Sequence, residues 1–160
     1  MSLTICQFNE LDQAVDSAKL LTCCTSCHWA NKLATARPFA DIETLIQHSD
    51  SLWDEVAKHE TDLLEAFDGH PQIGNVATLK QKYRNTQDSA AHEQSGANEA
   101  EDEVLEALAK GNQDYLNKFC FIFIVFATGK SAQQMLELLL ARLPNNRHTE
   151  LANAATEQNK

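Results

Sequence analysis

Apolar side chains recur along most of this chain three or four residues apart, which is the spacing of one face of an α-helix. The alternation of apolar and polar residues that is typical of strands is nearly absent. The longest helical stripe comprises Ile42, Leu45, Ile46, Leu52, Val56, Leu63, Leu64 and Phe67. Turn-forming residues are scarce as well, with 5 Gly and 3 Pro in 160 residues. The pattern predicts an all-α fold with few turns.

Residues that favour helix ends divide the chain into predicted helices. Ser26, Asp41 and Ser131 each precede an apolar stripe and can accept a backbone hydrogen bond as N-terminal caps. Gly69 and Gly111 are expected to end helices, with Gly69 at the C′ position. We expect helices over about 10–22, 26–36, 41–69 with a break near 49–51, 75–83, 99–111, from 112, 131–143 and from 149.

The longest apolar run, residues 119–127, is ambiguous. Its sequence, Phe-Cys-Phe-Ile-Phe-Ile-Val-Phe-Ala, has the propensity of a buried strand. A single strand would have no partner in this chain, so we interpret the run as a buried, irregular helical segment at the centre of the fold. The predicted architecture is a single-domain bundle of roughly eight helices over residues 1–160.

The charge of the chain excludes some partners. Lys and Arg number 13 against 23 Asp and Glu, a formal charge of −10, so nucleic acids and anionic membrane surfaces are not expected to bind. Much of the excess lies in residues 86–109, which contain Asp88, Glu93, Glu99, Glu101, Asp102, Glu103 and Glu106 and no Lys or Arg. Residues 70–85 carry three basic side chains and no acid, which leaves room for a small anionic substrate.

No stretch of the sequence has the basic region and apolar core of a signal peptide. The apolar run at 119–127 is too short to span a bilayer. We therefore expect a cytoplasmic location, in which the 5 cysteines would be reduced thiols.

Three cysteines and a histidine gather at Cys23, Cys24, Cys27 and His28. Cys24 to His28 matches C-x-x-C-H, the pattern of covalent haem attachment, and the four side chains could also be zinc ligands. A thioredoxin-like motif would need a strand–helix context that the sequence lacks. We favour small residues packing at a helix start, with Trp29 in the core, and predict no metal site.

Two further segments could carry acid–base chemistry. His70 lies between Gly69 and Pro71 on a stiff, non-helical corner, where an imidazole is well placed to move protons near neutral pH. A surface turn with an incidental histidine explains the same residues equally well. Glu93 and Gln94 follow His92 in a polar stretch, which by itself is typical of a solvated helix face. Together with His70, however, the segment offers an acid–base pair, an imidazole and a carboxylate from distant parts of the chain.

These motifs and others occur in the order found in one known family. The sequence resembles 2-oxo-4-hydroxy-4-carboxy-5-ureidoimidazoline (OHCU) decarboxylase over about residues 8–155. The matching pieces are Phe8-Asn9, Cys24 with Ser26 and Trp29, Arg37-Pro38-Phe39, His70-Pro71, Ile73-Gly74, Glu93-Gln94, Asn117-Lys118-Phe119, Phe121-Ile122-Phe123-Ile124, Gly129-Lys130-Ser131, Arg142-Leu143 and Glu150-Leu151-Ala152. Each is weak alone, whereas their joint order and spacing are specific.

The resemblance implies an all-α homodimer that decarboxylates a small anionic substrate to (S)-allantoin and CO2 in urate breakdown, without a cofactor. It places the catalytic histidine at His70 and the essential glutamate at Glu93. The substrate pocket would use further residues, namely Pro71, Ala90, Gln94, Ile124, Val125, Phe126 and Ala127.

The sequence departs from the family at two places. Many members carry Ser where this chain has Ala90. Many also extend past Lys160 through a basic helix with a substrate-binding Arg that has no match in this sequence. Either the sequence is truncated or another cation serves, for which Arg37 and Arg142 are the candidates. A non-catalytic, ligand-binding helical dimer of the same fold is therefore the alternative function. A metal or redox protein built on the cysteine cluster is the third.

Overall fold

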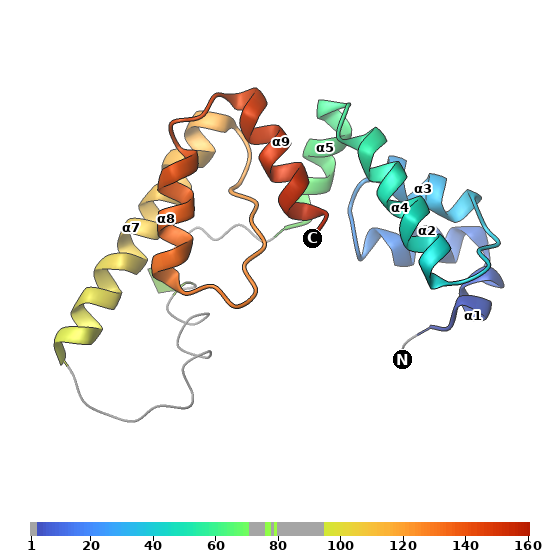
Figure 1. The fold of residues 1–160 in the computed structure, drawn as a ribbon, viewed down its shortest axis with the longest axis horizontal. Helices are drawn as coiled ribbons and strands as arrows, with labels where there is room; N and C mark the ends of the chain where they lie inside the picture. Colours follow the sequence, from blue (N-terminus) through green and yellow to red (C-terminus); the bar gives the residue numbers. More distant parts are fainter. Residues whose placement is uncertain (1–2, 71–75, 78, 80–94) are drawn as a thin grey trace. The chain divides into compact units, whose positions relative to one another are not determined.

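The computed structural model describes residues 3–70, 76–77, 79 and 95–160 (Figure 1). Within these ranges the chain is helical and has no strand, which confirms the all-α prediction. The helices are α1 (Ile5–Asn9), α2 (Gln13–Leu21), α3 (Cys27–Thr35), α4 (Ile42–Val56), α5 (Glu60–Asp68), α7 (Ser95–Phe119), α8 (Ala132–Arg142) and α9 (Arg147–Gln158). None of these helices is both long and apolar enough to cross a membrane.

The chain divides into two compact units, one formed by residues up to His70 and one by residues from Pro71 onward, apart from single residues at the C-terminus. The single domain over 1–160 stays a prediction.

The first unit packs α3, α4 and α5 around an apolar core. The buried residues of these three helices are Trp29, Ala30, Leu33, Ala34, Leu52, Trp53, Val56, Leu63, Ala66 and Phe67. Two predicted caps are confirmed: the fully buried Ser26 hydroxyl accepts from Trp29 N at 3.3 Å, and Asp41 accepts from Thr44 N at 2.8 Å. Four residues of the predicted stripe, Leu52, Val56, Leu63 and Phe67, belong to this core. The others do not, since Ile42 and Ile46 are exposed and Leu45 and Leu64 are half-buried.

The predicted break at 49–51 is wrong, because α4 runs without interruption from Ile42 to Val56. The hydroxyls that could have capped a new helix are used otherwise. Ser49 accepts a hydrogen bond from the Trp29 indole at 3.1 Å, and Ser51 donates to the Gln47 carbonyl at 3.0 Å. A hydroxyl engaged this way inside a helix no longer competes with its backbone, so the helix continues.

The N-terminal helix α1 is not anticipated by the sequence analysis. A capping box between Thr4 and Gln7 begins it, and Asn9 then pairs with the Phe39 backbone in both directions at 2.8 and 2.9 Å. Arg37 adds hydrogen bonds to the carbonyls of Phe8 (2.9 Å) and Leu11 (2.7 Å). The Phe8-Asn9 and Arg37-Pro38-Phe39 motifs are thus two halves of one structural joint.

The second unit is organised around the long helix α7, with α8 packed along it (Figure 1). The expected end at Gly111 and new start at Asn112 are wrong, because α7 continues to Phe119. A Cβ at Gly111 would lie 2.5 Å from Leu139 Cδ2, so the glycine permits close helix packing and does not stop the helix. Asn112 donates to the Leu108 carbonyl at 2.8 Å within the helix.

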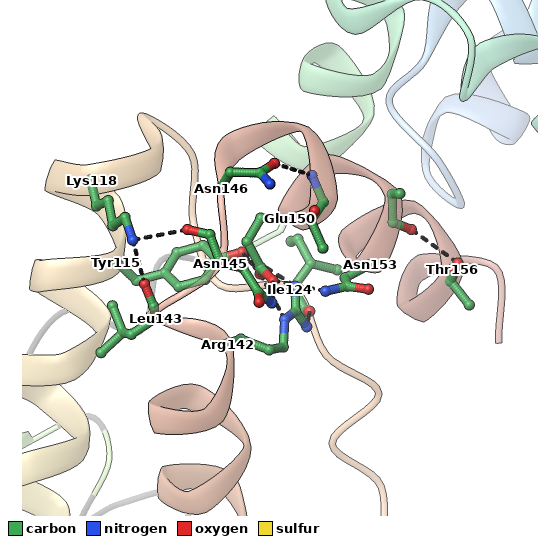
Figure 2. A network of polar contacts seen from close by, with 12 residues as sticks. Tyr115, Lys118, Ile124, Arg142, Leu143, Asn145, Asn146, Glu150, Asn153 and Thr156 are labelled. Carbon is green, nitrogen blue, oxygen red and sulfur yellow. Dashed lines mark hydrogen bonds and ion pairs between the residues drawn. The ribbon is translucent and has the colours of Figure 1, made fainter.

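The start of α8 agrees with the prediction from the sequence, whereas the start of α9 does not. Ser131 and Gln134 form a capping box at the start of α8, as expected for Ser131. Helix α9 begins at Arg147, ahead of the expected start at 149, so Thr149 lies inside the helix and does not cap it. Asn146 caps it by accepting from Thr149 N at 2.9 Å (Figure 2). A side-chain acceptor three residues ahead of a backbone donor is the usual geometry of an N-cap.

Residues 120–131 correct the interpretation of the apolar run, because they form an irregular, non-helical segment. Cys120 leaves α7 with a left-handed backbone (φ 57°). Beyond it, Phe121 and Phe123 pack their rings on Tyr115, with centroids 5.7 and 5.2 Å away. Aromatic packing on α7 and the side-chain hydrogen bonds described below replace the bonds that a helix would have made.

Candidate functional site

His70 follows the C-terminus of α5, at the end of the first unit. Its backbone N–H donates to the Phe67 carbonyl at 3.0 Å, and its side chain is exposed. Gly69 ends α5 as predicted, but it is the C-cap residue with φ −70°, not a left-handed C′ residue. The imidazole therefore stands on a helix end whose backbone is right-handed and well anchored.

Thr25 holds this helix end. Its hydroxyl donates to the carbonyls of Glu65 at 2.7 Å and Ala66 at 3.2 Å, both in the last turn of α5. The backbone N–H of Cys27 adds a bond to Glu65 Oε2 at 2.9 Å. The loop before α3 is thus fastened to the turn that carries His70. Sequence analysis singled out this loop for its cysteines and missed Thr25.

Other predicted site residues lie outside the part of the chain that the structure describes. These are Pro71, Ala90, Glu93 and Gln94. Their assignment to the site stays a prediction.

The remaining predicted site residues lie together in the irregular segment of the second unit. Ile124 is buried, Val125 and Ala127 are half-buried, and Phe126 is exposed. Three side chains hold their backbone: Arg142 Nη1 donates to the Ile124 carbonyl at 2.8 Å, Phe126 N donates to Glu157 Oε2 at 2.9 Å, and Lys130 Nζ donates to the Phe126 carbonyl at 2.6 Å. The segment is consequently irregular but fixed.

A buried carboxylate, that of Glu150, is connected to this segment through Arg142 (Figure 2). Glu150 is fully buried, with no exposed side-chain surface. It accepts hydrogen bonds from Tyr115 Oη at 2.5 Å, Arg142 Nε at 2.7 Å, Asn145 Nδ2 at 2.7 Å and Asn153 Nδ2 at 2.8 Å. Four donors satisfy both of its oxygens, which a buried charge requires.

The network shifts the ionisation of its members. Burial alone would raise the pKa of Glu150, but the hydrogen bonds from Asn145, Tyr115, Asn153 and Arg142 hold it below its ordinary value. Burial first, and then the hydrogen bond to Glu150, raises the pKa of Tyr115. Glu150 is therefore an anion in the folded protein, and Tyr115 is a neutral donor.

Arg37 and Arg142 are not free cations for a substrate. Arg142 is committed to Glu150 and Ile124, and its guanidinium lies 4.8 Å from the Phe123 ring centroid. Arg37 is committed to the backbone carbonyls of Phe8, in α1, and Leu11, just after it. Each holds main-chain groups in place, so neither is available as the substrate-binding cation considered above.

The cysteine cluster surrounds the start of α3. Cys23 and Cys27 are exposed, and a hydrogen bond to the Glu65 carboxylate, followed by the negative charge of that group, raises the pKa of the Cys27 thiol. His28 Nδ1 lies 3.3 Å from Asp62 Oδ2. Among the described residues, no three His, Cys, Asp or Glu side chains form a group that could hold a metal ion. A raised thiol pKa is the opposite of what a nucleophilic or metal-binding thiolate needs.

Comparison with known proteins gives one consistent result. The model of the family described as OHCU decarboxylase matches residues 9–160. The chain is 34% identical over 138 residues to the uric acid degradation bifunctional protein TTL of Arabidopsis thaliana, covering 86% of this chain and 42% of that protein. It is 28% identical over 156 residues to the uric acid degradation bifunctional protein PucL of Bacillus subtilis, covering 96% and 30%. The chain thus spans less than half the length of these curated relatives.

Solved structures agree with the fold. A crystal structure of OHCU decarboxylase in the presence of (S)-allantoin aligns with a TM-score of 0.66 at 31% identity, covering 88% of this chain and 89% of that one. A crystal structure of (S)-allantoin synthase aligns with a TM-score of 0.69 at 16% identity, covering 99% and 50%. At that identity the second match supports the fold alone.

Proposed function

This chain belongs to the OHCU decarboxylase family, and from that membership we propose that it converts 2-oxo-4-hydroxy-4-carboxy-5-ureidoimidazoline to (S)-allantoin and CO2 in urate breakdown. The observation that carries the proposal is the family match over residues 9–160. The aligned crystal structure of OHCU decarboxylase in the presence of (S)-allantoin, at 31% identity, supports the same substrate class.

The reaction needs no cofactor, because the substrate can accept the electrons itself. The bond between the ring carbon and the carboxylate breaks, CO2 leaves, and the electron pair remains in the ring, where the adjacent imidazolone system delocalises it. One proton then joins the carbanion on a single face. The protein has to orient the carboxylate out of the ring plane and handle protons, which is positioning and acid–base work.

His70 is the proposed acid–base group. An imidazole can exchange a proton near neutral pH, and this one is exposed on a helix end that is anchored by Phe67 and Thr25. It would take the proton of the substrate hydroxyl or deliver one to the carbanion. Glu93 would bind N–H groups of the ureido arm or the ring, although the two roles could be exchanged.

The remaining pocket residues are proposed as substrate contacts. Pro71, Ala90 and Gln94 would lie beside the acid–base pair. The segment from Ile124 to Ala127 would contribute backbone groups, because a non-helical chain keeps amide and carbonyl groups that a helix would consume. The bonds to Arg142 and Glu157 give this segment the fixed shape that such recognition requires.

We also propose that the protein is a cytoplasmic homodimer. Large apolar side chains that are more than half exposed support a covering partner: Ile42 and Ile46, one turn apart on α4, at 62% and 51%, and Leu140 on α8 at 53%. Light scattering after size-exclusion chromatography should give twice the chain mass of 17.8 kDa. A single-chain mass would contradict the dimer.

The test of the function is a coupled assay. Urate is oxidised and its product hydrolysed in the presence of this protein, and formation of (S)-allantoin is followed by circular dichroism. The protein should accelerate the signal well beyond the spontaneous reaction and yield one enantiomer. A racemic product at the spontaneous rate, together with saturable binding of allantoin, would support the alternative of a non-catalytic ligand-binding dimer. The commitment of Arg37 and Arg142 to structural bonds is the observation that favours that alternative.

A further inference from the structure

The end of α5 is held at one point by a residue far away in the sequence. Thr25 Oγ1 donates to the Glu65 carbonyl at 2.7 Å and to the Ala66 carbonyl at 3.2 Å. These carbonyls belong to the last turn of α5, where a helix has no backbone donor for them. Thr25 therefore supplies a partner that the helix itself cannot.

Gly69 shows how tightly this contact is built. Its φ of −70° is open to any residue, so backbone conformation does not demand a glycine there. Space does: a Cβ at position 69 would lie 2.6 Å from Thr25 Oγ1, 2.7 Å from its Cγ2 and 3.2 Å from its Cβ. Thr25 cannot turn away without giving up its hydrogen bonds to α5.

The loop that carries Thr25 is itself firmly attached. The next residue, Ser26, is fully buried and caps α3, and Trp29 packs in the core. Thr25 thus connects a rigid helix start to the chain one residue before His70. The His70 backbone is in turn bonded to the Phe67 carbonyl at 3.0 Å.

We propose that Thr25 is a positioning residue for His70, fixing the imidazole through its hydroxyl bonds to α5 and its contact with Gly69. The proposal rests on the proposed function, in which His70 is the acid–base group. Misplacing such a group by about 1 Å is enough to slow a reaction about 100-fold.

The first test separates the hydroxyl from the shape of the side chain. Thr25→Val keeps the shape and removes the donor, whereas Thr25→Ser keeps the donor. We expect kcat for (S)-allantoin formation to fall about tenfold in Thr25→Val, KM to stay within about twofold, and Thr25→Ser to recover most of the loss. The matched control is Thr22→Val, which removes a hydroxyl bond to the Lys19 carbonyl (2.6 Å) that does not reach α5. An unchanged kcat in Thr25→Val, or an equal fall in Thr22→Val, would overturn the proposal.

The second test uses the contact with Gly69. Gly69→Ala should reduce kcat, because its Cβ displaces Thr25. Adding Thr25→Ala removes the two atoms that clash, so the double variant should be more active than Gly69→Ala alone. If the losses of kcat in Gly69→Ala and Thr25→Ala simply add in the double variant, the two residues do not act through one contact, which contradicts the proposal.

A third measurement separates this proposal from the proposed function. The imidazole resonances of His70 can be assigned by their loss in His70→Asn and compared between variants by NMR. They should shift in Thr25→Val and stay in place in Thr22→Val. Unshifted resonances overturn the role of Thr25 whatever the activity. If the wild-type protein has no turnover, the proposed function is overturned. The positioning of His70 by Thr25 is then tested by the NMR resonances alone.

Discussion

The guanidinium of Arg142 donates to the buried carboxylate of Glu150, with Nε 2.7 Å from Oε2. The same guanidinium donates from Nη1 to the Ile124 carbonyl (Figure 2). An ion pair between a fully buried carboxylate and a largely buried guanidinium thus connects α8 and α9 to the irregular segment that carries four of the proposed pocket residues. Stability and the shape of that segment depend on one network.

Removing Glu150 should be strongly destabilising. In Glu150→Leu the Arg142 charge and the Tyr115 hydroxyl lose their buried acceptor, and breaking such a pair costs about 3–5 kcal/mol. The free energy of unfolding in urea measures the loss. Glu137→Leu is the control, because Glu137 is exposed and accepts a hydrogen bond from the Gln133 side chain on the surface of α8. A loss below about 1 kcal/mol in Glu150→Leu would contradict a central role for the network.

Stability should fall in acid, partly because of Glu150. Its pKa is lower in the folded protein than the ordinary value of 4.5, so the unfolded chain binds the proton first as pH falls. The contribution is complete above about pH 5 and is lost as pH falls through the folded-state pKa. Urea unfolding of wild type and Glu150→Gln at a series of pH values should show a shallower decline in the variant.

Other carboxylates account for the fall of stability with pH that remains in Glu150→Gln. The pKa of Asp41 is lowered by Thr44 N–H, and that of Glu55 by its bond to Lys32. Equal slopes in wild type and variant would show that Glu150 does not ionise with a lowered pKa.

The catalytic assignment predicts large and selective losses of activity. His70→Asn and Glu93→Gln should each lower the rate of (S)-allantoin formation about 100-fold or more, the usual contribution of a positioned acid or base. The controls are His59→Asn, an exposed histidine at the other end of α5, and Glu103→Gln, an exposed acid of α7. Near-normal activity in either catalytic variant would refute the role given to that residue.

Glu157 should affect substrate binding through Phe126. Its carboxylate accepts from Phe126 N, and although burial acts to raise its pKa, the bonds from Lys160 and Phe126 keep it lowered. Loosening this end of the pocket segment in Glu157→Ala should raise KM about tenfold, roughly the effect of losing one hydrogen bond to a charged group.

Two further variants test whether the rise of KM in Glu157→Ala comes from the lost hydrogen bond to Phe126 N. Glu157→Gln keeps an acceptor for Phe126 N and should recover most of the affinity. Glu137→Ala removes the same charge from an exposed site of α8 and should leave KM unchanged. A similar rise of KM in Glu137→Ala would instead indicate general attraction of an anionic substrate.

Local patterns predicted the features that depend on neighbours in the sequence. The caps at Ser26, Asp41 and Ser131 are confirmed, because each bond joins residues three apart and needs no other part of the chain. The end of α5 at Gly69 is confirmed for the same reason, although its conformation is not. The ordered motifs from residue 8 to 155 also identified the family, which fixes the expected position of the catalytic histidine.

Tertiary contacts decided the rest. Gly111 looks like a helix stop, yet it lies inside α7 and admits Leu139 against that helix. Gly69 does end α5, but it also admits Thr25 against the helix, which the sequence does not show. The apolar run at 119–127 leaves the helix because Tyr115, Arg142 and Glu157 supply packing and hydrogen bonds from other elements. Helical spacing and capping bonds are local, so the sequence alone determined where helices form. Which side chain fills a gap or satisfies a distant carbonyl depends on elements far apart in the chain, and only the folded structure decides it.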